Sequence, residues 1–186
     1  DYYGAISDYN KAIELNPNDS AAYYNRGISK KKLKDDYGAI SDYTKAIELD
    51  PNFANAYYNR GISKKNLKDY NGAISDYTKA IELNPNFANA YYNRGNSKDN
   101  LKDDYGAISD YTKAIELNPN DSMAYYNRGI SKVNLKDYYG AISDYTKAIE
   151  LNPNDVDAYV NRGASKEDLG DLNGACADWK KAAELG

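Results

Sequence analysis

The chain has 186 residues, with 24 lysines and arginines against 28 aspartates and glutamates, and its formal net charge is −4. That length is enough to bury a sizeable core. The acidic balance gives no general reason to expect nucleic acid or an anionic membrane surface as a partner. Histidine is absent, which excludes Ser-His and Cys-His nucleophiles and histidine metal sites.

Neither the cysteine content nor the motifs of the chain indicate catalysis. The single cysteine, Cys176, excludes an intrachain disulfide framework and favours a reducing compartment such as the cytoplasm. No apolar run approaches the roughly 18–20 residues of a membrane span. The phosphate-binding patterns GxxxxGK[ST] and GxGxxG do not occur. We therefore expect no enzyme, no cofactor, no metal site and no membrane partner.

The sequence repeats itself every 34 residues. The positions that mark this period most clearly are prolines and glycines: Pro17, Pro51, Pro85, Pro119, Pro153, Gly27, Gly61, Gly95, Gly129 and Gly163. Cutting the chain two residues after each proline gives a half repeat at 1–19, full repeats at 20–53, 54–87, 88–121 and 122–155, and a C-terminal repeat at 156–186. Such a period is typical of an array in which each repeat covers its neighbour.

Each repeat predicts two helices, and the half repeat at 1–19 predicts only the second of them. In 54–67 the apolar residues fall near one helical stripe, and in 72–83 they follow the i, i+1, i+4, i+7, i+8 spacing. Asp69 is the expected N-cap of the second helix, and Asn84-Pro85-Asn86 ends it because proline cannot continue the helix. In the last repeat Cys176 replaces an isoleucine of this stripe and is expected in the core.

A helix–turn–helix repeat of this length with these marker residues resembles the tetratricopeptide repeat. In repeat 54–87 the resemblance is carried by Tyr57, Gly61, Leu67, Ala73, Tyr77, Ala80 and Pro85. It covers the whole chain, and it implies an all-α, right-handed superhelical solenoid that forms a single array over 1–186. It also implies a non-catalytic scaffold that binds an extended peptide or a partner protein in the concave groove.

Two positions depart from the family pattern. An arginine stands where the family has a leucine: Arg26, Arg60, Arg94, Arg128 and Arg162. A lysine stands where the family has an aromatic residue: Lys30, Lys64, Lys98, Lys132 and Lys166. These departures put charge at positions that the family packs.

An unpaired buried charge is costly, so we predict an aspartate partner for each arginine. The candidates recur at the same interval in the second helices: Asp8, Asp42, Asp76, Asp110, Asp144 and Asp178. The partner lies either in the arginine's own repeat or in the preceding one. The alternative is a row of exposed arginines that binds acidic ligands.

The residues expected to bind a peptide lie on the first helices, on the face that lines the groove in the proteins this chain resembles. They include the asparagines Asn25, Asn59, Asn93, Asn127 and Asn161. One amide can bond the C=O and the N–H of a peptide group together. Such a row is similar to the asparagine ladder in the superhelix of O-linked N-acetylglucosamine transferase. The alternative is that these amides cap or bridge neighbouring helices.

Tyrosines and lysines complete the predicted groove. Amphipathic contact area is expected from Tyr24, Tyr58, Tyr92 and Tyr126. Lys31 and Lys65 make the early part of the groove basic, which favours a ligand with an acidic stretch. The two-carboxylate clamp by which some tetratricopeptide domains hold chaperone C-termini is not expected, because its lysines have no counterpart here.

Two other classes of function stay open. The chain could be a self-assembling structural module, with residues 1–19 of one molecule packing head to tail on residues 175–185 of another. It could also be the targeting arm of a larger enzyme.

Overall fold

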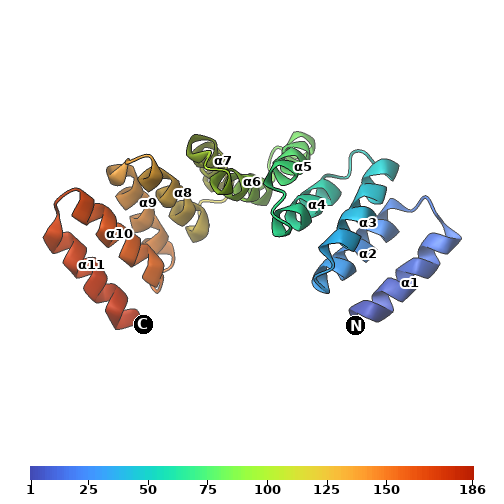
Figure 1. Cartoon of the computed structure of the whole chain (residues 1–186), viewed down its shortest axis with the longest axis horizontal. Helices are drawn as coiled ribbons and strands as arrows, with labels where there is room; N and C mark the ends of the chain where they lie inside the picture. Colours follow the sequence, from blue (N-terminus) through green and yellow to red (C-terminus); the bar gives the residue numbers. More distant parts are fainter. The chain divides into compact units, whose positions relative to one another are not determined.

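The chain folds entirely into α-helices, as the repeat pattern predicts (Figure 1). The computed structural model describes all 186 residues and contains eleven helices and no strand. It divides into two compact units, Asp1–Ser97 and Lys98–Gly186, and the boundary falls inside one helix. We call these compact unit 1 and compact unit 2 and describe each by itself.

The helices alternate between the first and the second helix of a repeat. Compact unit 1 holds α1 (Tyr2–Leu15), α2 (Ser20–Lys32), α3 (Asp36–Leu49), α4 (Ala54–Asn66), α5 (Tyr70–Leu83) and most of α6 (Ala88–Asn100). Compact unit 2 holds the end of α6 with α7 (Asp104–Leu117), α8 (Ser122–Asn134), α9 (Tyr138–Leu151), α10 (Val156–Asp168) and α11 (Leu172–Leu185). The even-numbered helices are first helices, and the odd-numbered helices are second helices.

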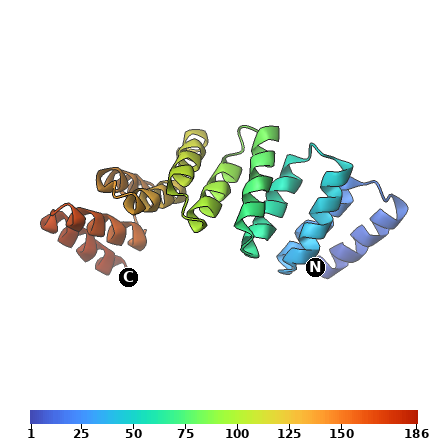
Figure 2. The same cartoon turned by 45° about the horizontal axis from the view of Figure 1, so that its top comes forward.

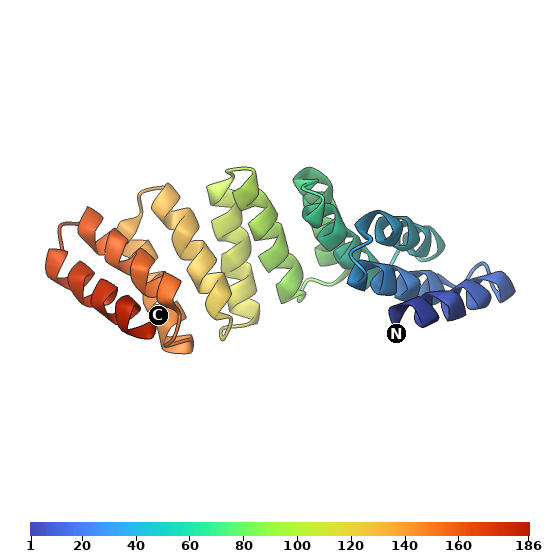
Figure 3. The same cartoon turned by 60° about the horizontal axis from the view of Figure 1, so that its bottom comes forward.

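Helices that follow one another in the chain pack together. In compact unit 1 the contacts run in succession from α1 through α5, and in compact unit 2 they run from α7 through α11. Figures 2 and 3 show this pairing within each unit from two further sides. The first helix α2 also touches the next first helix, α4. The predicted stack of helix–turn–helix repeats is therefore confirmed, while its treatment as one array over 1–186 stays a prediction.

Alanine, tyrosine and glycine build the core of each repeat. On α5 the buried residues are Ala73, Asp76, Tyr77, Ala80 and Ile81. The ring of Tyr77 lies directly on Gly61 of α4, where an added Cβ would come within 2.7 Å of the ring carbon Cε1. Gly27 and Gly129 lie in the same way against Tyr43 and Tyr145, so glycine is needed here for the two helices to approach around a buried aromatic ring.

A tight turn joins the two helices of a repeat. Between α4 and α5 the N–H of Asp69 bonds to the C=O of Lys64 at 2.9 Å, and the N–H of Lys68 bonds to the C=O of Lys65 at 2.9 Å. This is the Schellman pattern, and Lys68 has a φ of 62°. Asp69 then caps α5 as predicted, because its carboxylate accepts the N–H of Gly72 at 2.9 Å. The helix begins at Tyr70, directly after this cap, rather than at residue 72.

The prediction that Cys176 lies in the core is wrong, because its side chain is exposed. The isoleucines at the same position of other repeats, such as Ile74 and Ile142, are themselves only half-buried.

Replacing Lys68 by glycine should stabilise compact unit 1. A side chain in the left-handed region costs about 1 kcal/mol, part of which is offset by the greater freedom of glycine in the unfolded chain. We expect a gain of a few tenths to about 1 kcal/mol in the free energy of unfolding, measured by urea titration with circular dichroism. Gly170 takes the same place in the last repeat with a φ of 82°, and Gly170→Lys should cost a similar amount. A loss of stability in Lys68→Gly would contradict this account.

Candidate functional site

A buried arginine–aspartate pair joins the two helices of a repeat. In repeat 54–87 the Nε of Arg60 donates to Oδ2 of Asp76 at 2.9 Å, and its Nη2 donates to Oδ1 at 2.7 Å. Asp76 is only 3% exposed. The same two-pronged geometry joins Arg26 to Asp42, Arg128 to Asp144 and Arg162 to Asp178. In these repeats the partner lies in the arginine's own repeat, which confirms the predicted pairing and selects one of the two alternatives.

The lysine that departs from the family pattern meets the same aspartate. Nζ of Lys64 lies 2.8 Å from Oδ2 of Asp76. The equivalent pairs are Lys30–Asp42, Lys98–Asp110, Lys132–Asp144 and Lys166–Asp178. This contact was not predicted from the sequence, although Lys64 follows Arg60 by four residues and so lies on the same helical face. Both departures from the family pattern are thus explained by one buried carboxylate.

Arg60 also reaches the preceding repeat. Its Nη1 donates to Oγ1 of Thr44 on α3 at 3.0 Å, and its guanidinium carbon lies 5.5 Å from the centre of the Tyr57 ring. One arginine therefore connects α3, α4 and α5. Because the guanidinium is used inside the fold, these side chains do not form an exposed row for acidic ligands.

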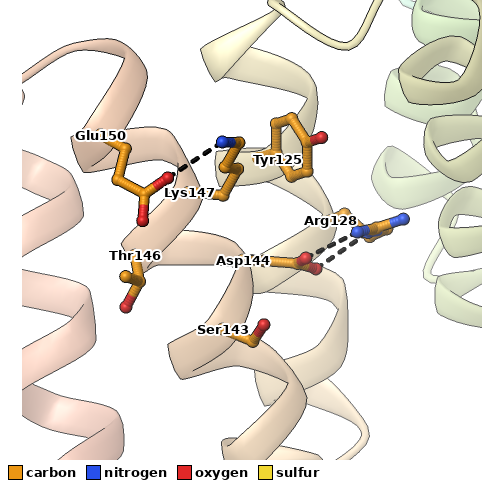
Figure 4. A pocket seen from close by; sticks show the side chains of 7 residues that line it. All are labelled: Tyr125, Arg128, Ser143, Asp144, Thr146, Lys147 and Glu150. Carbon is orange, nitrogen blue, oxygen red and sulfur yellow. Dashed lines mark hydrogen bonds and ion pairs between the residues drawn. The ribbon is translucent and has the colours of Figure 1, made fainter.

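Figure 4 shows the equivalent pair in compact unit 2, beside an open recess. Arg128 and Asp144 face one another across α8 and α9, and Lys147 forms a separate ion pair with Glu150 at 2.9 Å. The charged side chains around this recess are already paired with one another, so the recess offers no free charge to a ligand.

The ion cluster also makes stability depend on pH. Burial opposes the charge on Asp178, but the hydrogen bonds from Arg162 and Lys166 outweigh it and hold the pKa of this carboxyl below its ordinary value. Because the pKa is lowered in the folded state, the charged form stabilises the fold above the ordinary carboxyl pKa. That stabilisation is lost as the pH falls through the lowered pKa.

Arg60→Leu should destabilise compact unit 1 strongly, because it leaves the buried Asp76 carboxylate with Lys64 as its one charged partner. Breaking a buried pair on one side costs about 3–5 kcal/mol, and we expect the lower end of that range in urea unfolding. In the double variant Arg60→Leu/Asp76→Leu no buried carboxylate remains, so a large part of the loss should be regained. A single variant as stable as the unchanged protein would show that the pair is not structural.

The predicted groove residues of compact unit 1 form hydrogen-bonded links between neighbouring first helices. Nδ2 of Asn59, on α4, donates to the hydroxyl of Tyr24, on α2, at 2.9 Å, and to its own helix at the C=O of Asn55 at 3.1 Å. Oδ1 of Asn59 accepts a hydrogen bond from Nζ of Lys31 at 3.2 Å. Three of the predicted residue types thus meet at one point between two repeats.

The next repeat has the same arrangement. Asn93 donates to the Tyr58 hydroxyl at 3.1 Å and accepts from Nζ of Lys65 at 2.9 Å. The Tyr58 ring is held in place by Phe87, with ring centres 4.6 Å apart. In compact unit 2 Asn161 donates to the Tyr126 hydroxyl at 2.9 Å. The remaining predicted residues, Asn25, Tyr92 and Asn127, lie at equivalent positions of first helices and are half-buried.

The two lysines of this face are half-buried cations without an ion pair. Burial lowers the pKa of Lys31, although the nearby Asp36 works in the opposite direction. Burial also lowers the pKa of Lys65. Each ammonium group donates one hydrogen bond to an asparagine oxygen and has further N–H groups available for other acceptors. The face therefore presents positive charge that the protein itself does not neutralise.

In this structure the asparagine amides link neighbouring first helices, which was the alternative to peptide binding in the sequence analysis. Peptide binding by the same residues stays a prediction. Both N–H groups of Asn59 are used, while its oxygen keeps a second lone pair and Tyr24 keeps its hydroxyl hydrogen. A bound peptide would therefore accept hydrogen bonds mainly from the tyrosine hydroxyls and the lysine ammonium groups. Tyr24 and Asn59 are 35 residues apart in the sequence, and Lys31 and Asn59 are 28 residues apart, so these hydrogen bonds form only when two repeats stack.

No group of three or more Cys, Asp and Glu side chains is placed to hold a metal ion. None of the eleven helices has the length and hydrophobicity that crossing a membrane requires.

Models of one protein family match nearly the whole sequence. A model described as "Tetratricopeptide repeat" matches residues 20–53, 54–87, 88–121 and 122–155. A "TPR repeat" model matches residues 1–34, and a further "Tetratricopeptide repeat" model matches residues 144–177. No curated protein matches the sequence.

Solved structures of similar fold cover most of the chain. A crystal structure of MamA is 30% identical, with a TM-score of 0.84 over 86% of this chain and 93% of that one. A structure titled "Crystal structure of YrrB: a TPR protein with an unusual peptide-binding site" is 27% identical, with a TM-score of 0.86 over 95% and 91%. MamA of Desulfovibrio magneticus RS-1, at 23% identity and a TM-score of 0.85 over 89% and 94%, shares the fold.

Proposed function

The chain belongs to the tetratricopeptide repeat family, and we propose that it is a non-catalytic scaffold that holds an extended peptide or a segment of a partner protein. The ligand lies along the first helices, in the groove expected from the family resemblance. Its backbone contacts the asparagine and tyrosine row, and its side chains include an acidic stretch that contacts Lys31 and Lys65. The structural relative YrrB, whose title names a peptide-binding site, supports this class of function.

One observation carries the proposal: polar groups with unused hydrogen-bonding capacity recur at two successive contacts between first helices in compact unit 1. The Tyr24 hydroxyl and the Lys31 ammonium group flank Asn59, and Tyr58 and Lys65 flank Asn93 in the same way. Repeats at a fixed spacing suit a ligand that is itself periodic, such as an extended chain. Peptide groups supply the acceptors that the tyrosine and lysine donors need.

The double variant Asn59→Ala/Asn93→Ala should weaken binding of an acidic, Gly- and Ser-rich peptide while changing thermal stability little. The amides anchor the tyrosine and lysine donors, so their loss should reduce affinity by roughly tenfold. The groups left behind are reached by solvent, so the loss of stability should stay below about 1 kcal/mol. Binding is measured by isothermal titration calorimetry and stability by thermal unfolding. Asn71→Ala, at an exposed position of α5, is the control. A lower melting temperature with unchanged binding would assign the row a purely structural role.

Affinity for the same peptide should also fall as salt is raised, because contacts of partly exposed lysines are screened. Titrations at increasing sodium chloride measure this dependence. Binding that does not change with salt would remove Lys31 and Lys65 from the proposed contacts.

A second candidate function is head-to-tail self-association. Helix α1 contains no buried residue, and its large apolar side chains Tyr3 and Leu15 are 73% and 88% exposed. This helix would pack on residues 175–185 of another molecule, a contact that does not close on itself and therefore propagates.

Light scattering over a range of protein concentrations tests this second function. Association should raise the mean mass with concentration, and Tyr3→Lys/Leu15→Lys should abolish the rise. A monomer at every concentration would exclude it without affecting the peptide-binding proposal.

A further inference from the structure

Compact unit 2 contains a carboxylate that fills a site between two repeats. Asp99, near the end of α6, accepts a hydrogen bond from the Tyr111 hydroxyl at 2.5 Å and from the Ser131 hydroxyl at 2.8 Å. Tyr111 belongs to the second helix of the same repeat, and Ser131 belongs to the first helix of the next one. The structure therefore shows which group fits between these two buried hydroxyls, namely a carboxylate.

Compact unit 1 has the same hydroxyls but no carboxylate. The positions equivalent to Asp99 in the two preceding repeats are occupied by Lys65 and Lys31. For Lys31 the hydroxyls that correspond to those of Tyr111 and Ser131 are the hydroxyls of Tyr43, in the same repeat, and of Ser63, in the next repeat. Both residues are 0% exposed, and neither hydroxyl has a hydrogen-bond partner.

The second equivalent site repeats the pattern. Tyr77 is 0% exposed, and its hydroxyl has no partner. The serine of this site, Ser97, turns back to the C=O of Asn93 at 3.0 Å. Lys65, at the position of Asp99, has turned to the oxygen of Asn93 instead of facing an acid.

The hydroxyls of Tyr43, Ser63 and Tyr77 are unusual because a buried donor without a partner costs free energy. At the position of Asp99, each of these sites has instead a lysine whose ammonium group is bonded to an asparagine and makes no ion pair. Donors and positive charge together are complementary to an anion, and Asp99 shows that a carboxylate fits the equivalent site. A water molecule could accept from a hydroxyl, but it would leave the lysine charge without a counterion.

We propose that compact unit 1 binds two carboxylates of its ligand, one in the site of Lys31, Tyr43 and Ser63 and one in the site of Lys65, Tyr77 and Ser97. Each is the side chain of an aspartate or glutamate in the bound peptide and takes the place that Asp99 fills in compact unit 2. This inference rests on the proposed peptide-binding function and names the side chains that it selects.

In the proposed binding step the lysine side chain is the part that moves. Its stem has four rotatable bonds, so it can move aside from the hydroxyls while its ammonium group stays close to the arriving carboxylate. The incoming group would accept hydrogen bonds from tyrosine and serine and neutralise the lysine. Binding would therefore satisfy the hydroxyls and the charge in a single step.

A pair of peptides provides the first test. One is a Gly/Ser peptide with two glutamates, and the other has glutamines at the same positions. The glutamate peptide should bind at least about tenfold more tightly, because hydrogen bonds to a charged group are the strong ones. Equal binding of the two peptides would overturn the carboxylate sites and leave the scaffold function intact. Failure of both peptides to bind would count against the scaffold function itself.

Tyr43→Phe/Tyr77→Phe separates the proposed role from a structural one. Removing two unpartnered buried hydroxyls should leave the melting temperature unchanged or raise it, and should reduce the preference for the glutamate peptide severalfold. The matched control Tyr111→Phe removes a hydroxyl that Asp99 uses, so it should lower the melting temperature. A lower melting temperature and an unchanged peptide preference in the double variant would overturn the inference.

The lysine positions allow a direct exchange. Lys31→Asp/Lys65→Asp supplies internal carboxylates to both sites and should abolish the preference for glutamate over glutamine. Adding Asp99→Lys opens a site of the same kind in compact unit 2 and should restore part of the preference for the glutamate peptide. The single variants Lys31→Asp and Lys32→Asp change the charge equally, and Lys32→Asp, at an exposed neighbouring position, should weaken binding only slightly. If Lys32→Asp and Lys31→Asp have equal effects, general charge rather than a built site decides binding, and the inference fails.

Discussion

The structure depends on a buried carboxylate, repeated in successive repeats, that an arginine and a lysine neutralise together. Asp76 is withdrawn from water, and without partners its charge would be too costly to keep there. Arg60 provides two parallel hydrogen bonds and Lys64 a third contact. Since Arg60 also donates to Thr44, the same group fixes how one repeat sits on the one before it. A packing surface of alanine and glycine has few large side chains to interlock, so this directional contact gives the helices a defined register.

The first-helix face uses polar groups in a different way. Around Asp76 every charge has its partner, whereas Lys31 and Lys65 have amide partners and no counterion. This difference separates the charged groups that hold the fold from the lysines that we propose contact a ligand. The position of Lys31 also differs between repeats, being Lys65, Asp99, Val133 and Glu167 in the later ones. Because the surrounding tyrosine and serine hardly change, this single position decides whether the site between two repeats is basic, closed by an acid, or apolar.

Binding to such a face would be a sum of similar small contributions. Each of the four full repeats supplies a tyrosine hydroxyl, an amide and a variable side chain in the same relative places. A backbone can be held by the constant groups, while the variable position selects side chains. The tyrosines suit this role because their rings are fixed by neighbouring aromatics, as Tyr58 is by Phe87, so little conformational freedom remains to be lost when a ligand binds.

The sequence by itself determined the helical repeat, because the period, the cap at Asp69 and the proline after each second helix are local signals that do not depend on neighbours. It also required a partner for each arginine, since a charge in a packed position must be neutralised. Only the tertiary structure decided that the aspartate is in the arginine's own repeat, that Lys64 shares it, and that Cys176 is exposed. The links of Asn59 to Tyr24 and Lys31, and the partnerless hydroxyls of Tyr43 and Ser63, also appeared only there. The physical reason is the same in each case: these contacts join residues from different helices or repeats, and their distances depend on how the helices stack.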